Sequence, residues 1–322
     1  MPQERAIDPR PGATAARNHL LDIAMRRWDG ILERRPDLKP AVDLQQRLLN
    51  LVIELAQTID GGRLPRLSLP PKYIATKLTR GVPAFAGEPI PLPVRVLHDA
   101  LLRLCGALAE GGAGEAAEHI RSAIESGRLE AGSLLAASLA REQTAIRTAA
   151  VQHGLAPDLV WLVAELAVSP FAHALQRTFF ASPAPENWKG GYCPACGSWP
   201  ALAEVVGGHR VLRCSFCALA WELATYACIY CGEDADLFVT AAPEEERKDR
   251  RVEICKSCGG YLKTVDAPEL SPFPLLAIAD LETMDLDLAA MERGYGRPTL
   301  KEFATGRSPQ NPPSLQSNKP EP

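Results

Sequence analysis

The 322-residue sequence lacks the features that would direct it to a membrane or out of the cell. It has no run of about 18 uninterrupted apolar residues, so we expect no transmembrane helix. The start, MPQERAIDPRPGATAARNHL, contains no apolar stretch of the secretory type, and neither Arg-Arg pair precedes an apolar run. We therefore expect a cytoplasmic protein with no membrane partner.

Common catalytic patterns are also missing. The sequence contains no G-x-S-x-G turn, no phosphate-binding glycine loop and no H-E-x-x-H motif. His98, His119, His153 and His173 are widely spread within predicted helices, which disfavours a shared set of ligands. We therefore expect a protein that is not an enzyme and has no small-molecule substrate.

Positive charge is scarce, with 35 Lys+Arg against 39 Asp+Glu and a net charge of -4. From Trp188 to Asp266 the count is 9 Lys+Arg against 11 Asp+Glu, and the run PEEERKDRR is interpreted as a solvated hairpin tip. A protein that binds phosphates normally carries a basic footprint. This balance argues against a nucleic-acid partner.

Cysteine is nearly absent from the first 190 residues, where Cys105 stands alone and is predicted to be a buried apolar residue. The other eight cysteines lie between Cys193 and Cys258. Composition changes at the same place, across the segment ASPAPENWKGG, from Ala, Leu, Glu and Arg to glycine turns and β-branched runs. The fold class expected is α+β, with an all-α part followed by β modules.

Apolar residues recur at helical spacing in the first part and predict helices over residues 14–36, 40–60, 93–110, 115–127, 131–153 and 156–180. Residues 61–93 hold seven prolines and one short helix around Tyr73 to Leu78. So long a loop is either functional or wrapped on the surface, and wrapping is favoured.

The second part, residues 192–265, is predicted to form short strands. Two hairpins are predicted, ALAEVVGGHRVLRC with its turn at Gly207-Gly208 and DLFVTAAPEEERKDRRVEIC with a charged tip, and ALAWELATYAC is a further strand. One closing helix is predicted in PFPLLAIADLETMDLDLAAMERGYG. The expected units are a helical domain (1–186), a first four-cysteine ribbon (187–226), a second (227–268), a C-terminal helix packing back (269–303) and a disordered tail (304–322).

The eight cysteines form four C-x-x-C pairs separated by 17, 10 and 23 residues. A tetrahedral ion needs two such turns facing each other, and the hairpins in the first and third gaps would bring their flanking turns together. In the simplest arrangement, the first and second turns share one ion and the third and fourth share the other. A cross-braced arrangement, in which the first and third turns share an ion, stays open. The predicted metal ligands are Cys193, Cys196, Cys214 and Cys217 at one site and Cys228, Cys231, Cys255 and Cys258 at the other.

Other uses of these cysteines fit less well. Disulfides are disfavoured in a cytoplasmic chain, and no βαβ unit surrounds any pair as in a thioredoxin. A glycine follows three of the second cysteines, where positive φ lets N–H groups face the sulfur, but Ala218 follows Cys217, so that turn should be strained or differently shaped. Four thiolates suit zinc or a single iron and leave no position for water, so each ion would hold the fold or shuttle an electron.

The segments YCPACGS, LRCSFCALAW, CIYCG, EICKSCGGYLK and DLETMDLDLAAMERGY resemble the formate dehydrogenase accessory protein family, FdhE, across residues 187–296. The helical half is compatible with the family, although its motifs are weak. The loop after Cys231 and the second hairpin vary in length between members.

The resemblance implies a cytoplasmic maturation factor, or chaperone, for respiratory formate dehydrogenase. It would bind the molybdenum-containing catalytic subunit before twin-arginine export, with homodimerisation left open. The resemblance also implies rubredoxin-like modules, one ion in each four-cysteine site and iron rather than zinc. A redox protein that passes electrons to its partner is the alternative, followed by a zinc-ribbon nucleic-acid binder.

Overall fold

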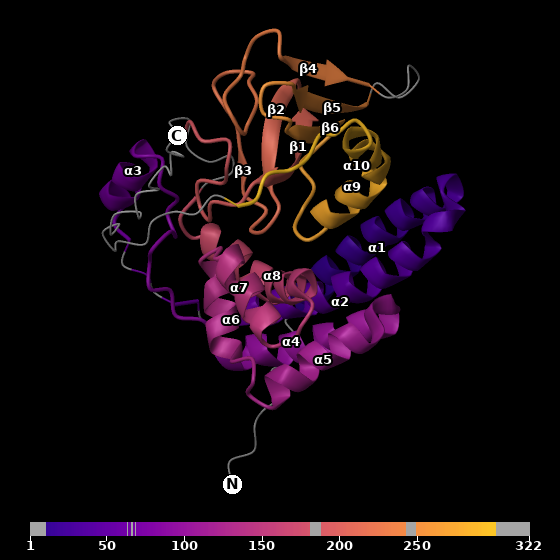
Figure 1. Ribbon diagram of the computed structural model, residues 1–322, viewed down its shortest axis with the longest axis vertical. Helices are drawn as coiled ribbons and strands as arrows, with labels where there is room; N and C mark the ends of the chain where they lie inside the picture. Colours follow the sequence, from indigo (N-terminus) through magenta and orange to yellow (C-terminus); the bar gives the residue numbers. More distant parts are fainter. Residues whose placement is uncertain are drawn as a thin grey trace, which may run out of the picture.

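The computed structural model describes residues 11–62, 64, 65, 67, 69–180, 188–242 and 249–300. Helices make up one side of the molecule and a sheet makes up the other, with two short C-terminal helices between them (Figure 1). This is the expected α+β class, an N-terminal helical part followed by β modules and a helical closing segment. The tail predicted to be disordered, residues 304–322, lies outside the described residues.

The helical part is centred on one apolar helix, α8, which packs against α2, α4, α6 and α7. By length and composition α8 could also cross a membrane, but 61% of its most apolar window is buried inside the protein, as in a core helix. Buried Cys105 on α4 belongs to the same core, as predicted. The helices are α1 (Pro11–Arg34), the 3-10 turn η1 (Pro36–Leu38), α2 (Lys39–Gly61), α3 (Pro71–Thr79), α4 (Val94–Leu108), the π-helical turn η2 (Ala109–Ala113), α5 (Gly114–Glu125), α6 (Ala131–Leu139), α7 (Gln143–Gln152) and α8 (Pro157–Gln176).

The single helix predicted over residues 131–153 is wrong, because the chain breaks at Arg141. Its φ is 63°, a left-handed conformation that ends α6, and the neighbouring Glu142 N–H donates to Ala137 O at 2.9 Å. Glycine normally occupies this position after a helix. Because arginine occupies the position instead, the sequence contains no glycine signal for the end of the helix.

All six strands in the described residues join one sheet in the order β3-β2-β1-β6-β5-β4. The first ribbon supplies β1 to β3 and the second supplies β4 to β6, and the two ribbons meet where β1 and β6 run parallel. The neighbours within each ribbon are antiparallel. The strands are β1 (Pro200–Val206), β2 (His209–Cys214), β3 (Ala220–Trp221), β4 (Phe238–Ala241), β5 (Arg250–Cys255) and β6 (Tyr261–Asp266).

Both predicted hairpins are present, and the first turns at Gly207 and Gly208 with φ of 58° and 86°, as a two-residue hairpin turn requires. Other details differ. The strand predicted in ALAWELATYAC shrinks to the two residues of β3, and β6, which joins the ribbons, was not expected. The predicted solvated tip lies partly outside the described residues. Its Arg250 is buried and paired with Asp285, contrary to expectation.

The closing segment forms two short helices, α9 (Leu276–Glu282) and α10 (Met284–Met291), where one was predicted. Thr283 separates them with φ of -115°. Leu275 and Ile278 join the core between α1 and α2, and Gln45 of α2 donates to Ala277 O at 2.8 Å. The segment therefore contacts the helical part on one side.

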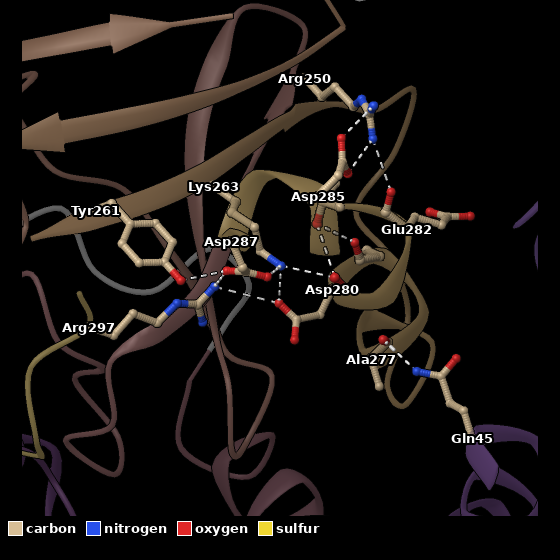
Figure 2. Close-up of polar contacts among 12 residues, drawn as sticks. Gln45, Arg250, Tyr261, Lys263, Ala277, Asp280, Glu282, Asp285, Asp287 and Arg297 are labelled. Atoms are coloured by element: carbon tan, nitrogen blue, oxygen red, sulfur yellow. Dashed lines mark hydrogen bonds and ion pairs between the residues drawn. The ribbon is translucent and has the colours of Figure 1, made fainter. Parts of the chain in front are cut away.

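Charged residues fix the other side of this segment to the sheet (Figure 2). Lys263 of β6 is fully buried, and its ammonium lies 2.6 Å from both Asp280 Oδ1 and Asp287 Oδ2. Tyr261 donates to Asp287 at 2.8 Å, and the guanidinium of Arg297 lies 2.9 Å from the same carboxylate. The acidic residues of the DLETMDLD motif thus neutralise cations that the sheet presents to the helices.

Candidate metal centres

The four cysteine turns share one backbone geometry. In each, the N–H of the first cysteine donates to the carbonyl oxygen five residues ahead: Cys193 to Ser198 (2.8 Å), Cys214 to Leu219 (2.9 Å), Cys228 to Glu233 (2.8 Å) and Cys255 to Gly260 (2.9 Å). The residue after the second cysteine is left-handed in all four turns, with φ of 85° at Gly197, 56° at Ala218, 83° at Gly232 and 69° at Gly259. Such a turn directs both of its sulfurs to one point.

Ala218 therefore carries the strain that was expected at this turn, because it adopts the same left-handed conformation as the glycines. The left-handed conformation destabilises a residue with a Cβ by about 1–2 kcal/mol. Replacement with glycine removes this strain, but glycine also has more conformational freedom in the unfolded chain, which offsets part of the gain. We expect Ala218→Gly to raise the free energy of unfolding by about 0.5 kcal/mol. Chemical denaturation of the metal-loaded protein measures this.

Gly232→Ala is the matched control at an equivalent turn. A Cβ there would meet nothing within 4 Å, so the substitution adds backbone strain without a clash. We expect it to lower the free energy of unfolding by about 1 kcal/mol. Destabilisation by Ala218→Gly would show that the alanine methyl group matters more than its φ.

The structure gathers the cysteines in the sequential arrangement rather than the cross-braced one. Within each group of four, all sulfurs lie within 4.8 Å of one another. The first group, site one, has Sγ–Sγ distances of 3.6 Å (Cys193 to Cys217) and 3.5 Å (Cys196 to Cys214). The second group, site two, has 3.7 Å (Cys228 to Cys258) and 3.6 Å (Cys231 to Cys255).

These spacings fit a tetrahedral ion. Metal–sulfur bonds of about 2.3 Å place the corners of a tetrahedron about 3.8 Å apart, whereas bonded sulfurs lie at about 2.05 Å. None of the eight cysteines is in a disulfide. Burial raises the pKa of the Cys193 and Cys217 thiols well above the ordinary value, and a bound cation would offset the cost of their ionisation. Each group could therefore hold one metal ion.

Site one is covered by the helical part of the chain, through the proline-rich segment whose role the sequence left open. The N–H groups of Ala84 and Phe85 donate to the carbonyls of Pro194 and Ala195 at 2.8 and 2.9 Å, on the first cysteine turn. Tyr192, next to Cys193, donates to Gly81 O at 2.6 Å. Residues 81–85 are named the strap. The segment thus wraps onto the site itself.

Two further side chains of the helical part complete this cover. The guanidinium of Arg141 lies 4.0 Å from the ring centroid of Phe216, which stands between Cys214 and Cys217, and is paired with Glu165. His173 of α8 lies 3.0 Å from Cys217 O through Nδ1. A carbonyl only accepts, so Nδ1 carries the proton. Burial lowers the pKa of His173 to about 4, which keeps the ring neutral near pH 7.

The sequence marked the whole proline-rich segment 61–93 but not the strap within it, and it indicated no role for Arg141 or His173. Their contacts join residues far apart in the chain, 111 positions for Tyr192 and Gly81 and 44 for His173 and Cys217. No local pattern marks such pairs. The other predicted histidines are not part of either four-cysteine group.

Site two lies in the outer ribbon and is more open. Cys228 and Cys255 are buried, whereas Cys231 and Cys258 are exposed to solvent. Tyr230 covers the inner side. The centroid of its ring lies 4.9 Å from that of the Trp199 ring, and its hydroxyl donates to Tyr261 O at 3.0 Å. Lys256 and Ser257, within the fourth turn, are exposed. The two sites therefore share a donor set but not an environment.

Comparisons with known proteins agree on one family, although no family model matches the chain. The chain is 33% identical over 118 residues to the "Protein FdhE homolog" of Aquifex aeolicus, which covers 34% of this chain and 40% of that protein. It is 36% identical over 111 residues to the homologue of Stutzerimonas stutzeri, covering 33% and 35%. The matched part is thus well under half the length of these relatives.

A solved structure extends the likeness to most of the chain. The crystal structure of the FdhE protein from Pseudomonas aeruginosa aligns with a TM-score of 0.50 and 24% identity, and covers 82% of this chain and 96% of that one. At this identity the match shows a shared fold. The chain is therefore similar to FdhE proteins in sequence over about a third of its length and in fold over most of it.

Proposed function

We propose that each four-cysteine group binds one metal ion, held by Cys193, Cys196, Cys214 and Cys217 at site one and by Cys228, Cys231, Cys255 and Cys258 at site two. The support is the geometry of the sulfurs, 3.5–3.7 Å apart in facing turns. Zinc and iron both accept such a set, and the family resemblance favours iron. A bound ion would supply crosslinking energy and, if it is iron, a one-electron couple.

We further propose that the protein is not an enzyme but a maturation factor for respiratory formate dehydrogenase. In this role it binds the immature catalytic subunit in the cytoplasm before export. The observation that carries this proposal is the fold shared with FdhE over 82% of the chain. Two closed four-sulfur sets support it, because four protein ligands leave no coordination position for a substrate.

Co-purification tests this function. The full chain, tagged and co-expressed with the catalytic subunit of a respiratory formate dehydrogenase, is expected to retain that subunit through affinity and size-exclusion steps. An exported protein of similar size that contains no molybdenum is the control and is expected not to be retained.

Two other outcomes would redirect the assignment. Recovery of oligonucleotide or ribosomal protein in place of the subunit would indicate a nucleic-acid binder. An iron-containing protein that bleaches with dithionite, recovers its colour in air and never retains the subunit would favour the redox protein.

A further inference from the structure

The two sites differ in how a molecule in solution could reach them. All four cysteines of site one are at most 4% exposed, whereas site two presents Cys231 and Cys258 at the surface. Since the donor sets are identical, a difference in the behaviour of the two ions must arise from their surroundings. Accessibility is one such difference in the described residues.

Site one is closed by segments that must move before its sulfurs become reachable. The strap is hydrogen-bonded to the first turn, and Arg141 and His173 lie against the second. The cysteines of site one also belong to the main hydrophobic core, together with residues of α4 and α8. An attacking ligand reaches them only after part of the core opens, and such openings cost a large share of the stability of a fold.

Site two needs no such opening. Its inner side is closely packed, since a Cβ on Gly260 would lie 2.5 Å from the Tyr230 ring, but two of its four cysteines, Cys231 and Cys258, are exposed to solvent. The strands around it, β4 and β5, lie at the end of the sheet away from α4 and α5 (Figure 1). A small ligand can therefore attack the ion by way of Cys231 or Cys258 while the fold stays intact.

We propose that site two is an exchangeable metal site and that site one holds its ion for as long as the protein stays folded. Site two would give up or accept a thiolate-preferring divalent ion, zinc or iron(II), in exchange with small chelating ligands in solution. As the ion leaves, the freed thiolates take up protons from water. The inference rests on the metal binding proposed above.

Release of zinc measures the exchange directly. Protein loaded with two zinc ions per chain is mixed with excess 4-(2-pyridylazo)resorcinol, which forms a coloured zinc complex. We expect one equivalent in a fast phase and the second at least about tenfold more slowly, because the second requires local opening. Release of both equivalents in one phase would overturn the inference. A loaded protein with fewer than two ions would count against the proposed metal binding instead.

Thiol labelling identifies the site that empties first. N-ethylmaleimide added at the end of the fast phase, followed by peptide mass spectrometry, is expected to modify Cys228, Cys231, Cys255 and Cys258. The four cysteines of site one should stay unmodified until the slow phase. Labelling that starts at site one, or that reaches all eight cysteines together, would contradict the assignment.

Two variants separate the phases. Cys258→Ser is expected to abolish the fast phase and leave the slow one unchanged. Phe85→Ala removes a buried ring from the strap, where it packs against Phe179 with centroids 5.9 Å apart, and is expected to speed up only the slow phase. If Phe85→Ala accelerated the fast phase instead, the roles of the two sites would be reversed.

Discussion

Replacing Cys217 with serine is expected to leave no stably folded protein, whereas Cys258→Ser is expected to yield a folded chain that has lost one ion. Each change removes one of four thiolates from an identical donor set. Structural zinc sites contribute about 10–16 kcal/mol to folding, and a typical domain is stable by only about 5–15 kcal/mol. Losing a large fraction of one site's contribution can therefore remove all of the net stability.

The position of each site relative to the hydrophobic core determines whether loss of its ion unfolds the whole protein. The cysteines of site one belong to the main hydrophobic cluster with residues such as Leu97 and Phe171, so their turns hold the helical part and the sheet together. None of the site-two cysteines belongs to that cluster, although all four are described. Failure of site two would therefore disorganise the outer ribbon and spare the larger part of the fold.

Circular dichroism, size-exclusion chromatography and denaturant titration of the unchanged protein, Cys217→Ser and Cys258→Ser measure the difference in folding and stability. Cys105→Ser is the control for a buried cysteine outside both sites. It buries a hydroxyl and should cost about 1–3 kcal/mol while the protein still folds. A Cys217→Ser protein with two ions and an unchanged denaturation midpoint would contradict the view that site one holds the two parts together.

Much of the metal-site geometry was predictable because its determinants are local. A C-x-x-C turn followed by a left-handed residue, and a hairpin between two such turns, depend on short stretches of chain. Gly207-Gly208 and the glycines after Cys196, Cys231 and Cys258 marked these features in the sequence. The sequential grouping of the sulfurs followed from the same spacing.

The rest depends on contacts between distant residues. The parallel pairing of β1 with β6 places Ala203 opposite Thr264, and no local sequence pattern near either residue predicts this pairing. Arg141 ends a helix where glycine is usual, because its side chain is held by Glu165 and the ring of Phe216. The leucines of the closing segment predicted helix, but its aspartates carry the equally important contacts to the sheet.

Lys263→Met is expected to have the second-largest effect, a loss of about 2–3 kcal/mol in the free energy of unfolding, below the range for a fully buried pair because Asp280 and Asp287 are partly exposed. Lys263 is 0% exposed and neutralises Asp280 and Asp287, both at 2.6 Å (Figure 2). Methionine fills a similar volume but leaves both carboxylates without this cation, at the junction of α9, α10 and the sheet. Arg297 still contacts Asp287, so the compensation would be partial.

The double variant Lys263→Met with Asp287→Asn distinguishes an ion-pair effect from a packing effect. If the cost arises from the unpaired carboxylate, the double variant should be more stable than the sum of the two single losses predicts, by about 1–3 kcal/mol. Lys72→Met, at an exposed lysine of α3, is the control for loss of a lysine charge and should shift stability by no more than about 0.5 kcal/mol. Strict additivity of the two single losses would show that Lys263 and Asp287 are not coupled, so that the loss on Lys263→Met does not arise from this ion pair.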